Sequence, residues 1–177
     1  MWQQAQNSWE NKQQGGNPNL SKQLHQRKRS EASLSDEYET PDSLVAELSK
    51  QYGIFPEVDV ASTYDNSKCV FRLHDSLKDE WTFDTFTKGK YLDIWLNPPQ
   101  TKCKEFVLKA NEQWCKHNIN IMMIIPANVL TTNYFADIIE NVEYHPIKGR
   151  ITFLVDGKPS PYPARNGYFV VIWRKRT

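Results

Sequence analysis

From residue 36 onward, apolar residues recur at two spacings, which together predict an alternation of helices and strands. Leu44, Val45, Leu48 and Tyr52 follow the three- and four-residue spacing of one helix face. Residues 119–126 form a continuous apolar run, as expected of a central parallel strand that is covered on both faces. The whole pattern predicts helices at residues 40–52, 102–117 and 133–140, and strands at residues 57–61, 91–96, 119–126, 143–147, 150–155 and 168–174.

The order of these elements predicts the fold class. Alternating strands and helices followed by a β-rich end indicate an α/β fold with a Rossmann-like, mostly parallel sheet and antiparallel C-terminal strands. We expect the last two strands to form an antiparallel pair, and residues 66–75 to form an irregular or short helical connection. Thr40 is the expected N-cap of the first helix, Pro41 its first residue and Gly53 its end.

The first 34 residues differ in composition from the rest of the chain. They are rich in Gln, Asn, Lys and Ser, show no apolar periodicity, and hold five Lys or Arg against two Glu. We therefore expect residues 1–34 to be a disordered Gln/Lys-rich tail and residues 35–177 to form one domain. The basic run at residues 27–29 either contacts phosphate groups or remains a solvated stretch of charge.

Overall charge and hydropathy exclude some classes of protein. The formal charge of the chain is +1, so it lacks the strongly basic balance of a protein that coats nucleic acid. It has no apolar run of roughly 18–20 residues and no signal-like apolar core near its start. We therefore expect a cytoplasmic protein without membrane contact.

The cysteines and histidines predict neither a disulfide framework nor a metal site. No CxxC spacing is present, so we expect reduced thiols at Cys69, Cys103 and Cys115. The four histidines share no spacing that is typical of metal ligands or of a catalytic triad. We therefore look for candidate catalytic residues among other residue types.

The most informative motif is Asn97-Pro98-Pro99, which directly follows the apolar run at residues 91–96. Two prolines fix two φ angles and hold Asn97 extended at the carboxyl end of a strand, where open α/β sheets bind ligands. Enzymes that methylate an amino group conjugated to a ring or carbonyl use such a loop. The Asn side-chain oxygen and the first proline's carbonyl accept hydrogen bonds from the target NH2. The alternative is an ordinary proline-rich turn.

Transfer to such an amine needs no strong base. The amine is a poor nucleophile because its lone pair is delocalised, whereas a sulfonium methyl group is highly electrophilic. Positioning and two hydrogen-bond acceptors can therefore supply most of the rate. This explains how the motif can be catalytic without a histidine.

Candidate cofactor residues lie near the first helix and the first strand. A helix N-terminus at Tyr38, Thr40 and Pro41 suits the carboxylate of a methionine-like cofactor, although a plain helix cap explains the same residues. Asp59 and Ala61 end the first strand, where small residues let a nucleoside approach the backbone. An Asp in that place can instead cap the following loop.

The next loop offers Asn66 and Asp75 as candidates for contacts with the cofactor's ribose or adenine. Turn residues of these types can equally satisfy their own backbone. No GxGxxG motif accompanies them. Only the positions of Asn66 and Asp75 in space can therefore distinguish a cofactor contact from a turn role.

Basic and aromatic residues in two stiff loops near the C-terminus suit contacts with phosphate groups and bases. The candidates there are Lys148, Arg150, Tyr162 and Arg165, and Lys102 beside the proline loop is a fifth. The same proline-rich loops can also form a stiff hairpin connection.

Taken in order, these motifs resemble the phage-type (Dam-like) family of DNA adenine-N6 methyltransferases. The resemblance spans roughly residues 36–174. It rests on Glu39-Thr40-Pro41, Val58-Asp59-Val60-Ala61-Ser62, Asn66-Ser67-Lys68-Cys69, Trp81, Asn97-Pro98-Pro99, Ile125-Pro126-Ala127, Thr131, Lys148-Gly149-Arg150-Ile151-Thr152-Phe153 and Pro161-Tyr162-Pro163.

The resemblance implies S-adenosylmethionine as methyl donor and adenine in DNA as acceptor, in a bacterial cell or a phage-infected host. Thr40 and Pro41 would line the methionine end, Asp59 and Ala61 the first-strand cofactor site, and residues 97–100 the catalytic loop. A homodimer or an accessory specificity subunit is a possible partner arrangement, because the chain is too short for a separate recognition domain.

Gln100 departs from the family pattern, in which Tyr, Phe or Trp usually follows the two prolines and stacks on the flipped base. The alternatives are that its amide hydrogen-bonds the base edge, or that Tyr134 or Tyr162 stacks instead. Two alternatives therefore stay open. One is a methyltransferase acting on an amide or amine in protein or RNA, and the other is a non-catalytic nucleic-acid-binding protein on the same scaffold.

Overall fold

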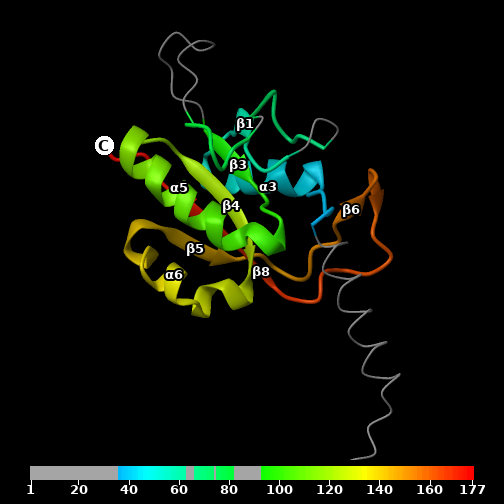
Figure 1. Cartoon of the computed structure of the whole chain (residues 1–177). Helices are drawn as coiled ribbons and strands as arrows, with labels where there is room; N and C mark the ends of the chain where they lie inside the picture. Colours follow the sequence, from blue (N-terminus) through cyan, green and yellow to red (C-terminus); the bar gives the residue numbers. More distant parts are fainter. Residues whose placement is uncertain (1–35, 63–65, 74, 82–92) are drawn as a thin grey trace, which may run out of the picture. The chain divides into compact units, whose positions relative to one another are not determined.

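The computed structural model describes residues 36–62, 66–73, 75–81 and 93–177, so the predicted tail at residues 1–34 lies outside the described residues. Within residues 36–177, the described strands form a six-stranded sheet in the order β2-β1-β3-β4-β8-β5 and a two-stranded sheet, β6-β7 (Figure 1). The strands are β1 Val58–Asp59, β2 Phe71–Arg72, β3 Ile94–Leu96, β4 Ile121–Pro126, β5 Glu143–Pro146, β6 Leu154–Val155, β7 Lys158–Pro159 and β8 Tyr168–Trp173.

The large sheet is mixed. β2, β1, β3 and β4 are parallel neighbours, whereas β8 is antiparallel to both β4 and β5. From β1 the chain adds β2 on one side and later β3 on the other. Ligands of open α/β sheets bind at such a switch point, outside the carboxyl ends of the strands.

Both faces of the sheet are buried, which explains the continuous apolar run of β4. Alternate residues of a strand point to opposite faces, and all six residues of β4 are buried. Ile121, Met123 and Ile125 pack with α5 residues such as Phe106, while Met122 and Ile124 pack with α3 and the β6-β7 region. Figure 1 shows α5 and α3 on different sides of the strands.

The described residues contain three α-helices and three 3-10 turns. Those of α type are α3 Asp42–Tyr52, α5 Cys103–His117 and α6 Asn133–Ala136, and the 3-10 turns are η1 Gln100–Lys102, η2 Ala127–Thr131 and η3 Ile139–Asn141. Gly53 ends α3 in the left-handed conformation, with φ 68°, and its N–H binds the Ser49 carbonyl. A residue with a Cβ would be strained there, which is why the glycine ends the helix.

The predicted α/β class, with a mostly parallel sheet and antiparallel C-terminal strands, is confirmed. Several boundaries were wrong. Helix α3 begins at Asp42, so Pro41 and not Thr40 occupies its N-cap position. The predicted strand at residues 57–61 is only the two residues of β1, and residues 66–75 contain strand β2 at the sheet edge.

Two further predictions near the C-terminus were wrong. The helix predicted at residues 133–140 is broken into α6 and η3. Residues 150–155 do not pair with β8, because β4 and β5 already flank that strand. Instead Ile151 and Phe153 are buried against one face of the sheet, and residues 151–164 form a hairpin across it, with Ser160 N–H bonded to Phe153 O at 2.8 Å and Ala164 N–H to Ile151 O at 2.7 Å.

All three cysteines are free, as expected. Among the helices of the described residues, none combines the length and apolarity that crossing a membrane requires.

Candidate active site

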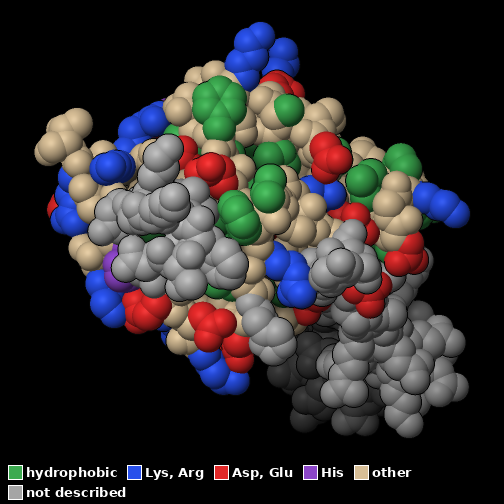
Figure 2. All heavy atoms as spheres, turned by 90° about the horizontal axis from the view of Figure 1, so that it is seen from above, with side chains coloured by type: hydrophobic (Ala, Val, Ile, Leu, Met, Phe, Trp, Pro, Cys, Tyr) green, Lys and Arg blue, Asp and Glu red, His purple; other side chains and the backbone are tan. Residues whose placement is uncertain are grey.

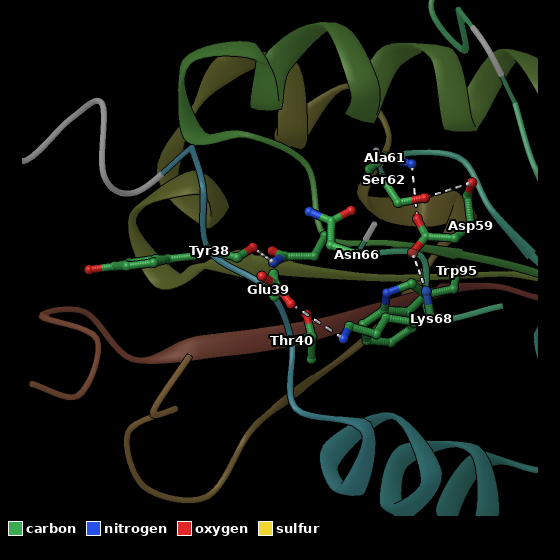
Figure 3. A pocket seen from close by; sticks show the side chains of 10 residues that line it. Tyr38, Glu39, Thr40, Asp59, Ala61, Ser62, Asn66, Lys68 and Trp95 are labelled. Carbon is green, nitrogen blue, oxygen red and sulfur yellow. Dashed lines mark hydrogen bonds and ion pairs between the residues drawn. The ribbon is translucent and has the colours of Figure 1, made fainter. Parts of the chain in front are cut away.

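A hollow with about 230 Å³ of empty space lies at the switch point of the sheet. Asp59 ends β1, and Asn97 follows β3, so the carboxyl ends of two neighbouring parallel strands meet there. The lining residues come from four segments of the chain (Figure 3): Tyr38, Glu39, Thr40, Asp59, Ala61, Ser62, Asn66, Lys68, Trp95 and Asn97.

Asn97 is held by the segment that precedes α3. Its Nδ2 donates to the backbone carbonyl of Tyr38 at 3.2 Å. A carbonyl can only accept, so the amide nitrogen must face Tyr38 and the Oδ1 must face elsewhere. Asn97 is partly buried and the following Pro98 is buried. The loop therefore presents a side-chain oxygen with a fixed orientation at the edge of the hollow.

Gln100 is anchored at the other end of this loop. It is exposed, and its Nε2 donates to the hydroxyl of Tyr168 at 3.1 Å. Tyr168 packs edge-on against Phe153, with ring centroids 5.1 Å apart, and Phe153 stacks on Tyr38 at 5.0 Å. A chain of contacts thus runs from Gln100 through three aromatic rings to the residue whose carbonyl holds Asn97.

Asp59 caps the loop that follows β1. Its Oδ1 accepts the Ala61 N–H at 3.1 Å, and its Oδ2 accepts the Lys68 N–H at 3.0 Å. Burial raises the pKa of the Asp59 carboxyl, and the N–H groups of Lys68 and Ala61 oppose that rise. The carboxylate therefore shapes the hollow mainly by fixing two backbone segments.

The structure adds a charged pair that the residue types alone did not single out. Lys68 Nζ lies 3.9 Å from Glu39 Oε2 and 3.1 Å from Asp42 Oδ1. Figure 3 shows the Lys68 side chain extending toward Glu39. The Lys68 and Glu39 side chains are only 10% and 15% exposed, whereas Asp42 is 87% exposed. The signal available in the sequence was Lys68 next to the candidate Asn66, with an acidic residue beside Thr40.

Thr40 contributes a buried polar atom. The residue is 2% exposed, and its Oγ1 has no hydrogen-bond partner within the described part of the chain. Thr40 does not cap α3, since the helix begins two residues later without a side-chain cap. Buried hydroxyls are normally paired, so Thr40 marks a place where a ligand group would complete the bonding.

Most of the predicted cofactor residues converge on the hollow, and two do not. Tyr38, Thr40, Asp59, Ala61 and Asn66 all line it. Pro41 instead lines a second hollow on the other side of its own segment. Asp75 lies in neither lining, and its carboxylate pairs with Lys78 at 2.6 Å. The interpretation of Asp75 as a turn residue fits this geometry better.

The predicted nucleic-acid residues are all exposed but do not gather in one lining. Lys148 and Arg150 line the second hollow with residues from the start of α3. Tyr162 is 78% exposed and lies on the 151–164 hairpin, and Arg165 follows that hairpin. Lys102 ends η1, beside the proline loop. Of the two alternative stacking residues, Tyr134 is packed against the core, whereas Tyr162 projects from it.

The charges form no extended field of one sign on the face that Figure 2 shows, where acidic and basic side chains are intermixed over the described residues. Among residues 36–62, 66–73, 75–81 and 93–177, no group of three or more His, Cys, Asp or Glu could hold a metal ion.

The chain is similar to proteins of a known family. The model of the family described as DNA N-6-adenine-methyltransferase (Dam) matches residues 27–177. A curated relative, the DNA N-6-adenine-methyltransferase of Escherichia phage T1, is 32% identical over 128 residues, which are 70% of this chain and 50% of the relative. The chain thus aligns with about half the length of that relative.

Proposed function

Because the chain belongs to the Dam family of DNA N-6-adenine-methyltransferases, we propose that it transfers a methyl group to the exocyclic amine of adenine in DNA. The observation that carries this proposal is the orientation of Asn97. Its nitrogen is bonded to the Tyr38 carbonyl, so its oxygen is the end that can accept a hydrogen bond from an incoming amine.

The residues of the hollow fit S-adenosylmethionine as the methyl donor, which the methyltransferase family implies. This cofactor supplies an electrophilic methyl group on sulfur. Thr40 offers a buried hydroxyl without a described partner, and Lys68 and Glu39 offer one charge of each sign. Ala61 and Ser62 are small residues at the end of β1, where a nucleoside can approach. A zwitterionic nucleoside cofactor matches this set.

The loop at residues 97–99 positions the acceptor. Asn97 Oδ1 and the Pro98 carbonyl accept hydrogen bonds from the adenine NH2, which localises the lone pair of the nitrogen and directs it toward the methyl group. The proton of the amine leaves to water after transfer. No general base is required.

We assign DNA contacts to five exposed residues, of which only the first lies beside this loop: Lys102, Lys148, Arg150, Tyr162 and Arg165. A duplex substrate requires the adenine to leave the base stack, at a cost of a few kcal/mol. We assign stacking on an extruded base to Tyr162, which is 78% exposed on a proline-stiffened turn. Base–aromatic stacking is worth about 1–3 kcal/mol.

A second candidate function follows from Gln100. An amide in place of an aromatic ring suits an acceptor that is hydrogen-bonded and not stacked, such as an amide or amine in protein or RNA. Gln100 is exposed, and its amide is bonded to the Tyr168 hydroxyl. We place this function second, because the family of the chain is defined by adenine methylation.

One experiment separates these functions. The full chain is incubated with S-adenosylmethionine labelled in the methyl group and with DNA, RNA and protein acceptors, and the products are hydrolysed and identified. We expect label in N6-methyladenine from DNA, and little from an Asn97→Ala control. Label confined to RNA or protein would select the second function. Absence of label in every acceptor, with cofactor bound, would favour a non-catalytic DNA-binding role.

A further inference from the structure

The ion pair in the hollow has a geometry that is poor for stability. Lys68 Nζ and Glu39 Oε2 are 3.9 Å apart, whereas charge-assisted N–H···O bonds are typically about 2.7–2.9 Å long. Both side chains are at least 85% buried. Burial strips water from two charges, and a separation of this length returns little of that cost. The closer partner of Lys68 Nζ, Asp42 Oδ1 at 3.1 Å, lies on the exposed side. The side of the ammonium group that faces Glu39 therefore keeps donor capacity for a ligand.

Both charges are held in place by contacts with other segments. The Glu39 backbone forms two hydrogen bonds with Leu154, of 2.9 and 2.8 Å, and its Oε1 accepts the Gly157 N–H at 3.3 Å. The Lys68 backbone is held by Asp59 Oδ2 at 3.0 Å. A ligand that binds between these charges would not have to order them first, which favours affinity.

A third polar group lies beside the pair. Thr40 is adjacent to Glu39 in the chain, lines the same hollow, and its buried Oγ1 lacks a partner among the described residues. A hydroxyl both donates and accepts. It can therefore serve a carboxylate or an ammonium group of a ligand that reaches the ion pair.

We infer that Lys68 and Glu39 recognise the amino-acid end of the methyl donor. Lys68 binds the carboxylate of the donor, Glu39 binds the ammonium group of the donor, and the Thr40 hydroxyl completes the bonding of either group. The inference rests on the proposed function, because it takes S-adenosylmethionine as the ligand. It adds Lys68 and Glu39 to the residues expected at the methionine end of the cofactor. Asp42 contacts the same lysine from the exposed side and has no part in this recognition.

Binding of two nucleosides to the full chain tests this inference. S-adenosylhomocysteine carries the amino-acid end, and 5′-methylthioadenosine has the same nucleoside without it. Calorimetry should show tighter binding of S-adenosylhomocysteine to the unchanged protein. Lys68→Met and Glu39→Gln should each weaken that binding by about tenfold or more, as expected for loss of a charged hydrogen bond, and should leave 5′-methylthioadenosine within about twofold of the unchanged protein.

The matched control is Asp42→Asn, which removes the exposed partner of Lys68 and should change neither affinity. Equal losses for both nucleosides in the Lys68 and Glu39 variants would assign the pair a structural role and overturn the inference. Equal affinities of the unchanged protein for the two nucleosides would overturn it without variants and leave the proposed function standing. Binding of neither nucleoside would overturn both.

Discussion

The two ends of the loop at residues 97–100 are held by different kinds of acceptor. Asn97 donates to a backbone carbonyl, that of Tyr38, whereas Gln100 donates to a side-chain hydroxyl, that of Tyr168. A carbonyl fixes which end of an amide faces it, but a hydroxyl can donate or accept and so permits the amide to turn. Under the proposed function, the end that performs transfer is therefore oriented by the backbone, and position 100 is the adjustable end.

The largest expected effect comes from the fixed end. Asn97→Ala removes the oriented acceptor, so kcat should fall by about 10²–10³-fold, which is the typical cost of losing one preorganised group that stabilises a transition state. Affinity for S-adenosylhomocysteine should stay nearly constant, because the hollow keeps its charged residues. Single-turnover methylation of adenine-containing DNA measures the first quantity and calorimetry the second.

Asn97→Asp serves as the control for that change. It keeps a side-chain oxygen but cannot donate to the Tyr38 carbonyl, so the loss should be intermediate, about tenfold. An activity of Asn97→Asp as low as that of Asn97→Ala would mean that the bond to Tyr38, and not the free oxygen, is the essential feature. Full activity of Asn97→Ala would refute the assigned role.

A smaller effect is expected at the adjustable end. Tyr168→Phe removes the hydroxyl that binds Gln100 while keeping the ring that packs on Phe153, so kcat/KM for DNA should fall about three- to tenfold. Gln100→Ala should produce a similar loss, and the double variant should lose no more than either single one, because both changes break the same bond. Losses that multiply would contradict the coupling.

The pH dependence sharpens the same test. Burial raises the pKa of Tyr168 to about 12, so the hydroxyl stays protonated across the neutral range. A raised folded-state pKa of a tyrosine contributes stability that is fully present below the unfolded value, near 10, and is lost as the pH rises toward 12. The ratio of the activities of unchanged protein and Tyr168→Phe should therefore be constant from about pH 6 to 9.

The smallest effect is expected just beyond the loop. Asp36 accepts hydrogen bonds from the N–H and hydroxyl of Thr101, at 3.2 and 2.7 Å. Both bonds are exposed, so Asp36→Ala should lower the free energy of unfolding by only about 0.5–1.5 kcal/mol. It should lower kcat no more than about threefold. Thermal unfolding and kcat measured together check this, and a loss as large as that of Asn97→Ala would show that the anchor is critical.

The sequence predicted the parts of the fold that depend on local pattern. The apolar run at residues 119–126 is the central strand β4, and residues 102–117 contain α5. The sequence-based prediction was wrong where tertiary contacts determine which residues form a strand. The two residues of β2 form a strand because they pair with β1, and residues 151–155 leave the large sheet because its edge beside β8 is already occupied.

The candidate site was predicted to a similar extent. Motifs at strand ends brought Asn97, Asp59 and Thr40 to one hollow, since parallel strands end at one edge. The charge pair of Lys68 and Glu39 was missed, because 29 positions separate these residues in the chain and only folding brings them together. Asp75 lies outside both hollows and pairs locally with Lys78.

The backbone bridge between Glu39 and Leu154 joins the hairpin to the edge of the hollow. Such a bridge does not depend on side-chain identity, and the other contact of the turn with Glu39 is also made by a backbone group, the Gly157 N–H. Side chains of the hairpin can therefore change without moving the residues of the hollow, provided that these backbone contacts are kept. Under the proposed function, the tip of the hairpin contributes to the DNA sequence preference and can be exchanged. Grafting the tip of a relative onto this chain should then change the preferred DNA sequence while the methylation rate on a matching site is kept.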